Sequence, residues 1–223
     1  MPHFPRAVLE AAGGWDAFNV TEDADLGVRL ARLGYRVAML DSRTLEEAPI
    51  APGQWLGQRT RWMKGWLQTF GVHTRDQARL ARQLGPLAAA GFHAYMGGLI
   101  LSALVHPLVY ALAIGHGVAS LGQGQPTRAV VSMVEVVALA NLAFGYLTAM
   151  ALGALAARRR GYEFWRHAML MPLYWLAISL AAYRAVFELR RAPFWWQKTE
   201  HGVSRVSEPA AHPIGGRADQ PAR

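Results

Sequence analysis

Two long apolar runs constrain this chain more than any other feature. They cover about residues 91–114 and 129–157, and a third apolar stretch covers about 168–187. Each of the first two is long enough to cross about 30 Å of hydrocarbon as a helix. Because lipid cannot satisfy backbone hydrogen bonds, segments that cross it on their own fold as helices. Residues 91–187 are therefore predicted to form a mostly α-helical transmembrane region.

The positions of basic residues predict the orientation of these runs. Only Arg128 lies between the first two runs, whereas the flanking segments hold Arg75, Arg79, Arg82, Arg158, Arg159, Arg160 and Arg166. The excess of positive charge on one side places residues 1–90 in the cytoplasm and the chain in the inner (plasma) membrane as a multi-pass protein. Residues 71–90 are basic and amphipathic and are predicted to form an interfacial helix.

The third apolar stretch leaves two alternatives open, because basic residues stand at both of its ends. Either it crosses the membrane and the tail lies outside, or Pro172 breaks it into a re-entrant or interfacial element. We favour the second alternative. Within the first two runs, His106 is interpreted as a polar group satisfied within its own helix, with a ligand as the alternative. Asn141 is interpreted as a polar group that packs helices together, with a role in a transport pathway as the alternative. Residues 203–223 have the composition of a disordered tail.

The net charge is +8 and the chain contains no cysteine. The basic residues flank apolar runs and no nucleic-acid-binding motif accompanies them, so the predicted partners are lipids and anionic substrates, with no nucleic acid. The absence of cysteine excludes disulfides and thiolate metal sites.

The region before the membrane runs predicts a helix followed by a strand. A hydroxyl that can cap a helix and an acidic first turn precede leucines at helical spacing and a glycine stop: Thr21, Glu22, Asp23, Asp25, Leu26, Leu30, Leu33 and Gly34. Residues 35–40 then alternate in the manner of a short strand. This pattern predicts an α/β layer in residues 1–70.

The acidic first turn offers a candidate catalytic group. Asp23 lies where backbone N–H groups and the positive helix end favour a carboxylate, which can act as a general base. Helix capping alone is the simpler explanation. Asp23 and Asp25 would point about 200° apart on a helix and could not chelate one metal ion together.

Residues 58–66 carry the second candidate site. On a helix, Gln58, Arg61, Trp62 and Gly65 share one stripe. A guanidinium suits a phosphate, an indole face suits a sugar ring, and an amide bonds hydroxyl groups. The alternative is an interfacial helix that anchors in lipid. Lys64 and Trp66, on other faces, are expected at the membrane surface.

Together these motifs resemble the membrane-embedded family 2 glycosyltransferases, the group of cellulose synthase, hyaluronan synthase and related β-glucan synthases. The resemblance covers Gly13-Gly14-Trp15, Thr21-Glu22-Asp23-Ala24-Asp25-Leu26-Gly27, Gly34-Tyr35-Arg36, Gln58-Arg59-Thr60-Arg61-Trp62 and residues 193–202. It implies that residues 1–70 are the C-terminal part of a GT-A domain. It also implies that residues 188–202 form a cytoplasmic segment with a Lys-Thr-x-His-Gly motif.

The resemblance also implies roles for individual residues. Asp23 matches the base of an inverting transfer from a nucleotide-diphosphate sugar to a growing, β-glucan-like polysaccharide. The acceptor and diphosphate end is matched by Gln58, Arg61 and Trp62, and the residues with possible supporting roles are Thr21, Glu22, Lys198, Thr199 and His201.

The chain also departs from the family pattern. Family members hold a divalent metal, Mg²⁺ or Mn²⁺, and the donor through strands and an Asp-x-Asp at a strand end that lie upstream of the matched motifs. This sequence does not include them, so no metal ligand is assigned. The chain is therefore expected to be inactive alone. The alternative is a non-catalytic membrane adaptor or a degenerate remnant of such an enzyme.

Overall fold

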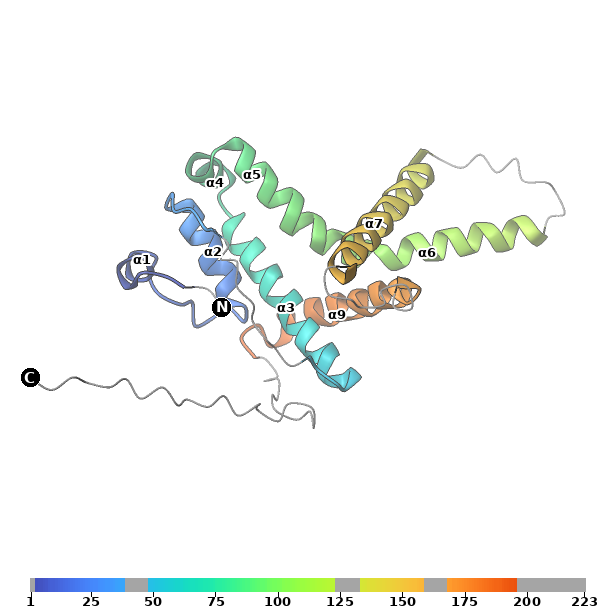
Figure 1. The fold of residues 1–223 in the computed structure, drawn as a ribbon, viewed down its shortest axis with the longest axis horizontal. Helices are drawn as coiled ribbons and strands as arrows, with labels where there is room; N and C mark the ends of the chain where they lie inside the picture. Colours follow the sequence, from blue (N-terminus) through green and yellow to red (C-terminus); the bar gives the residue numbers. More distant parts are fainter. Residues whose placement is uncertain (1–2, 39–47, 123–132, 159–167, 196–223) are drawn as a thin grey trace, which may run out of the picture.

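The computed structural model describes residues 3–38, 48–122, 133–158 and 168–195. Every regular element among these residues is a helix, and Figure 1 shows their arrangement. The elements are α1 (Arg6–Ala11), α2 (Glu22–Arg32), α3 (Pro52–His73), α4 (Gln77–Leu84), α5 (Pro86–Phe92), the π-helical turn η1 (His93–Gly97), α6 (Gly98–Gly122), α7 (Met133–Arg158) and α9 (Met171–Arg191).

The predicted α/β class is wrong, because the described residues contain no strand. Helix α2 forms where the acidic first turn predicted it, and Gly34 follows it with φ of +84°. Residues 35–38 of the predicted strand are irregular, and residues 39–40 lie outside the described part. A strand needs a neighbour to accept and donate its backbone hydrogen bonds. Tyr35 and Val37 are 42% and 76% exposed, so no sheet face covers the alternating side chains.

Helix α3 is the central element of the part of the chain before the membrane runs. It begins with Pro52 in its first turn, where the missing N–H costs nothing, and it packs against α2 on one side and α9 on the other (Figure 1). Met63 of α3 forms a core with Ile100 and Ala103 of α6 and with alanines of α9. Trp66 is partly buried and packs against this core, and its expected place at the membrane surface stays a prediction.

Small residues allow α9 to pack closely against α3 and α6. Ala181, Ala182 and Ala185 are fully buried, whereas leucines on its other faces are exposed. Pro172 lies in the first turn of α9, and the helix continues without a break to Arg191. The interpretation of Pro172 as a helix breaker is therefore wrong, because proline is compatible with a helix start. Whether α9 crosses a membrane stays a prediction.

Two helical segments are long and apolar enough to cross a membrane. They are Pro86–Gly115, which joins α5, η1 and part of α6, and Val136–Arg158 in α7. This finding rests on length and composition, so the crossings remain predictions. Pro107 lies inside α6, where it cannot donate the hydrogen bond of a regular helix, and the run from α5 through α6 bends (Figure 1). The predicted domain boundaries also remain predictions.

Helix α2 touches α3 at a position where only glycine fits. A Cβ atom on Gly65 would lie 2.0 Å from Oγ1 of Thr21 and 2.6 Å from its Cβ. Thr21 is buried and makes no side-chain capping bond, so its hydroxyl is used in packing rather than in capping α2. The close approach of Thr21 and Gly65 therefore fixes where α2 starts relative to α3.

Gly65→Ala is expected to destabilise the protein by about 1–3 kcal/mol, because the added methyl group overlaps Thr21. Gly71 lies in the same helix with open space around it, so Gly71→Ala is expected to stabilise by about 0.5–1 kcal/mol. Denaturant unfolding in detergent, followed by tryptophan fluorescence, measures both. Equal effects of the two substitutions would contradict the packing described here.

Candidate active site

Asp23 lies in the first turn of α2 and points to solvent. Its Oδ1 accepts a hydrogen bond from the N–H of Ala24 at 2.8 Å. The side chains of Thr21 and Asp25 on either side are buried, while those of Glu22 and Asp23 are exposed. An exposed carboxylate at a helix start, held between two buried neighbours, is accessible to a hydroxyl group and has a defined direction.

Arg61 lies beside the loop that leads into α2. Its NH1 donates to the carbonyl oxygen of Val20 at 3.4 Å, and its buried Nε has no hydrogen-bond partner among the described residues. Val20 stands three residues before Asp23, so α3 brings the guanidinium into the neighbourhood of the candidate base. A guanidinium with unused donors suits an anionic or hydroxyl-rich ligand.

Gln58 and Trp62 flank Arg61 on α3 and are half-buried. The guanidinium carbon of Arg59 lies 4.4 Å from the centre of the Trp62 ring and 5.6 Å from that of Trp55. Arg59 was not singled out by the sequence pattern, yet its cation–π contact covers part of the Trp62 indole. Among the described residues, no hydrogen bond joins Gln58 or Trp62 to Asp23.

The segment after α9 is fastened to α3 by Lys64, whose side chain is fully buried. Its Nζ donates to the carbonyl oxygens of Ala192, at 3.2 Å, and Trp195, and lies 3.5 Å from a carboxylate oxygen of Glu188. The expected position of Lys64 at the membrane surface is therefore wrong. An ammonium group at the carboxyl end of α9 satisfies carbonyls that the helix leaves without partners.

Gln68, one turn beyond Lys64, joins the same segment to the loop before α2. Its Nε2 donates to the carbonyl oxygens of Pro193 at 3.0 Å and Phe18 at 3.3 Å, and its Oε1 accepts from the N–H of Val20. The rings of Phe18 and Phe194 also meet, with centres 5.3 Å apart. The chain therefore leaves α9 beside the loop that carries the candidate base. The predicted supporting residues Lys198, Thr199 and His201 lie outside the described part.

A buried ion pair and a buried hydrogen bond hold α2 one turn beyond Thr21. Nε2 of His73 lies 2.9 Å from Oδ1 of Asp25, while Nε of Arg29 donates to Oδ2 at 2.7 Å. NH1 of Arg32 lies 2.7 Å from Nδ1 of His73. Because a guanidinium only donates, the imidazole accepts at Nδ1 and carries its proton on Nε2. Burial raises the pKa of Asp25, but the hydrogen bond from His73 and the charge of Arg29 together lower that pKa below its ordinary value.

The sequence pattern missed these buried partners. The sequence pattern places Asp25 in an acidic helix start but gives it no partner, and it assigns no role to His73 or Gln68. One signal does indicate that α3 carries buried polar side chains. Thr60, Lys64 and Gln68 recur every four residues and form a polar stripe on this helix. Among residues 3–38, 48–122, 133–158 and 168–195, no three His, Asp or Glu side chains are grouped so that they could hold a metal ion.

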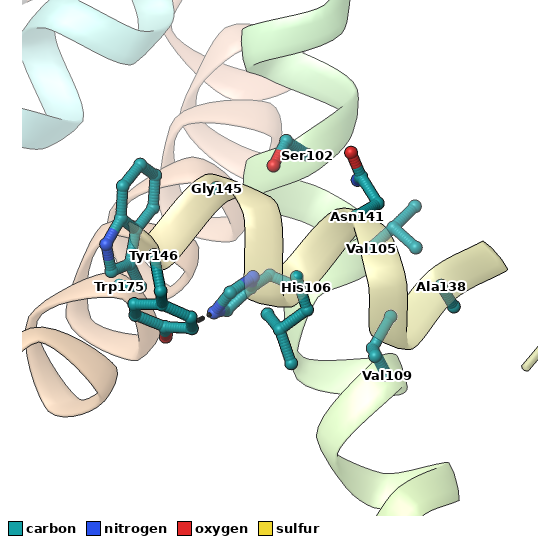
Figure 2. Close-up of a pocket in the computed structure, with 10 residues that line it drawn as sticks. Ser102, Val105, His106, Val109, Ala138, Asn141, Gly145, Tyr146 and Trp175 are labelled. Atoms are coloured by element: carbon teal, nitrogen blue, oxygen red, sulfur yellow. Dashed lines mark hydrogen bonds between the residues drawn. The ribbon is translucent and has the colours of Figure 1, made fainter. Parts of the chain in front are cut away.

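A separate cavity of about 170 Å³ lies among α6, α7 and α9 (Figure 2). His106 and Tyr146 line it, with Nε2 of the histidine 3.1 Å from the tyrosine hydroxyl, and Tyr110 also bonds that hydroxyl. His106 therefore has its partner on the neighbouring helix α7, and the interpretation that it is satisfied within its own helix is wrong. Asn141 lines the same cavity. None of the candidate catalytic residues does.

Asp25→Asn is expected to destabilise the protein by about 2 kcal/mol, because it leaves the guanidinium of Arg29 without its buried counter-charge. This value is low for the loss of one partner of a buried ion pair, because the side chain of Arg29 keeps some contact with water. Asp23→Asn is the matched control in the same helix turn and is expected to cost less than about 1 kcal/mol. Denaturant unfolding measures both. A larger loss from Asp23→Asn would contradict this assignment.

The same ion pair predicts a pH dependence. A carboxyl group with a lowered pKa in the folded state stabilises the protein above its unfolded pKa, which is about 3.8, and this stabilisation disappears as the pH falls through the lower folded value. Below pH 3.8 the unmodified protein should therefore lose stability more steeply than Asp25→Asn. Parallel curves of unfolding free energy against pH would contradict the lowered pKa.

Comparison with known proteins agrees with the motifs. The family model for glycosyl transferase family group 2 matches residues 3–196. A probable glycosyltransferase, YdaM of Bacillus subtilis, is 38% identical over 61 residues, which cover 27% of this chain and 14% of that protein. The UDP-forming cellulose synthase catalytic subunit of Komagataeibacter sucrofermentans is 35% identical over 86 residues, which cover 35% of this chain and 10% of that protein.

A third relative is the beta-monoglucosyldiacylglycerol synthase of Synechocystis, 35% identical over 66 residues that cover 29% of this chain and 14% of that protein. The matched segments thus span no more than about a seventh of the length of these relatives. No solved structure matches the chain. Because the family model covers most of its length, the chain belongs to glycosyl transferase family group 2.

Proposed function

We propose that this glycosyltransferase chain provides the base and the acceptor side of a site that transfers a sugar from a nucleotide-diphosphate sugar to a growing, β-glucan-like polysaccharide. The observation that carries the proposal is the placement of Arg61 beside the loop that leads to Asp23. The names of two relatives, a UDP-forming cellulose synthase and a glucosyl lipid synthase, support glucosyl transfer as the chemistry. The apolar helices support a location at the inner membrane.

The proposed reaction is a direct displacement with inversion. Asp23 takes the proton from the acceptor hydroxyl as its oxygen forms a bond to the anomeric carbon, and the bond from that carbon to the diphosphate breaks. The guanidinium of Arg61, positioned by its hydrogen bond to the carbonyl oxygen of Val20, stabilises the negative charge that develops on the leaving diphosphate. The indole of Trp62 supplies an aromatic face for a sugar ring, and Gln58 hydrogen-bonds sugar hydroxyls.

The divalent metal implied by the family resemblance does not fit the described residues. They offer no group of three His, Asp or Glu side chains at one place. Asp23 and Asp25 do not form a chelating pair, since one is exposed and the other is engaged by His73 and Arg29. We therefore expect donor and metal binding to require further residues and derive no step through the metal.

Binding of the acceptor can be tested without the donor. Cello-oligosaccharides should bind the purified chain, and Trp62→Ala should weaken binding about tenfold through the loss of the stacking face. Trp15→Ala removes an exposed indole outside α3 and should change the affinity by less than about twofold. Isothermal titration in detergent measures both.

The alternative function, a non-catalytic membrane adaptor or degenerate remnant, predicts no oligosaccharide binding to any of these variants. An affinity that Trp62→Ala leaves unchanged would remove Trp62 from the acceptor side.

Sugar transfer itself is expected to be absent when the chain is incubated alone with UDP-glucose, Mg²⁺ or Mn²⁺ and an oligosaccharide. If transfer is observed, the need for further residues is disproved, and Asp23→Asn should then lower the rate at least about 100-fold. Asp76→Asn makes the same change at the start of α4, where asparagine caps as well as aspartate, and should leave the rate unaltered. Transfer that survives Asp23→Asn would show that Asp23 is not the base.

A further inference from the structure

A hollow of about 700 Å³ lies between the segment before α2, α2 itself, the end of α3 and α4. Three arginines line it: Arg29 and Arg32 from α2, and Arg79 from α4. Asp23, Arg61 and Trp62 do not line it, so it is separate from the candidate active site. Neither the family resemblance nor the proposed reaction gives this hollow a role.

Within the described part of the chain, each of the three guanidinium groups keeps a donor without a partner, and the one on Arg29, NH2, is buried. Arg29 is engaged by Asp25 and by the carbonyl oxygen of Ala12. Nε of Arg32 donates to Gln83 and NH1 donates to His73, so NH2 has no partner among the described residues. Within the described ranges, the exposed side chain of Arg79 has no hydrogen bond or ion pair. Arg32 and Arg79 therefore present free donors to the same hollow.

The acidic groups of the hollow do not cancel the positive charge of its three arginines. Asp25 is already paired with Arg29 and hydrogen-bonded to His73. Asp16 accepts the N–H of Phe18 at 2.9 Å and is the other carboxylate of the lining. Three guanidinium groups face two carboxylates, so the hollow keeps a positive balance. A fork of donors with positive charge matches the oxygens of a phosphate group.

The position of the hollow suggests where that phosphate comes from. Arg79 and Gln83 belong to α4, which ends at Leu84, and the apolar run Pro86–Gly115 begins two residues later. Leu87, in the first turn of that run, is 86% exposed. If the run crosses the membrane, the hollow lies at the depth of the lipid headgroups. Basic side chains at that depth attract anionic lipids.

We propose that the hollow binds a phosphate group between Arg32 and Arg79, and that an anionic lipid headgroup supplies it. The exposed side chains of Trp15 and Phe18 form an apolar wall of the hollow, which suits the glycerol and acyl parts of a lipid. Free inorganic phosphate shares the same chemistry at the two guanidinium groups. The assignment of the source to lipid rests on the proposed membrane location.

The test uses the full chain in detergent micelles, titrated with dihexanoyl phosphatidylglycerol in a calorimeter. Arg79→Gln is expected to weaken binding about tenfold, because it removes hydrogen bonds to a charged group. Arg82→Gln is the matched control: it removes the same charge from an exposed position of the same helix, but Arg82 does not line the hollow. Its effect should stay within about twofold.

Two further arms distinguish the sources of the phosphate. Inorganic phosphate that displaces the lipid would show that the phosphate group is recognised and that soluble phosphate can also occupy the hollow. Lipid binding that inorganic phosphate leaves unchanged, but that Arg79→Gln weakens, would assign the hollow to the lipid. In both cases the phosphate site is supported.

Equal weakening by Arg79→Gln and Arg82→Gln would overturn the proposal, because it would show attraction by general surface charge. The absence of binding by both phosphatidylglycerol and phosphate would overturn it as well. Thermal unfolding of Arg79→Gln checks that the variant is folded, since this side chain has no partner within the described ranges to lose. Flotation of the unmodified chain with vesicles tests the membrane location separately.

Discussion

The buried ammonium group of Lys64 joins parts of the chain that lie more than a hundred residues apart. Taking such a charge out of water is costly unless acceptors surround it. Lys64 meets two carbonyl oxygens beyond the end of α9 and the carboxylate of Glu188, and Gln68 extends the same contact to Pro193 and Phe18. These bonds are specific in direction, so they define how α9 and the loop before α2 meet on α3.

The position of Asp23 depends on contacts made by its neighbours. Thr21 packs against Gly65, and Asp25 pairs with His73, so α2 is fixed to α3 at two points one turn apart. Asp23 lies between these points on the opposite face of the turn and stays exposed. A residue with few contacts of its own thereby gains a defined place, which is the condition for a group that must meet a substrate.

The sequence could predict the helices but not the partners of their buried polar groups. The acidic first turn and the glycine after α2 are local signals, and α2 forms where they placed it. The predicted strand failed because three alternating side chains indicate a strand only if a second strand pairs with it, and pairing is not a local property. Lys64 was assigned to the surface because lysine is rarely buried without partners.

The partners of the buried groups lie too far along the chain to be read from spacing. His73 stands 48 residues from Asp25, and Trp195 stands 131 residues from Lys64. The motif residues Asp23, Gln58, Arg61 and Trp62 were found because their chemistry is unusual for their positions. Their supporting residues have ordinary chemistry, and only the fold brings them together. The structure adds that Arg61 contacts the carbonyl oxygen of Val20 and that Arg59 lies over the Trp62 ring, and neither contact follows from the motif.

Helices α3, α6 and α9 share one core, and this links the apolar run that includes α6 to the candidate site. Met63 of α3, Ile100 and Ala103 of α6, and Ala182 and Ala185 of α9 are buried in a single cluster. Close-packed cores change arrangement in discrete steps and resist gradual deformation. Met63 stands two residues from Arg61, so a shift of α6 or α9 relative to α3 would repack the turn that carries the guanidinium. The orientation of α6 and α9 is therefore part of what determines the geometry around Asp23.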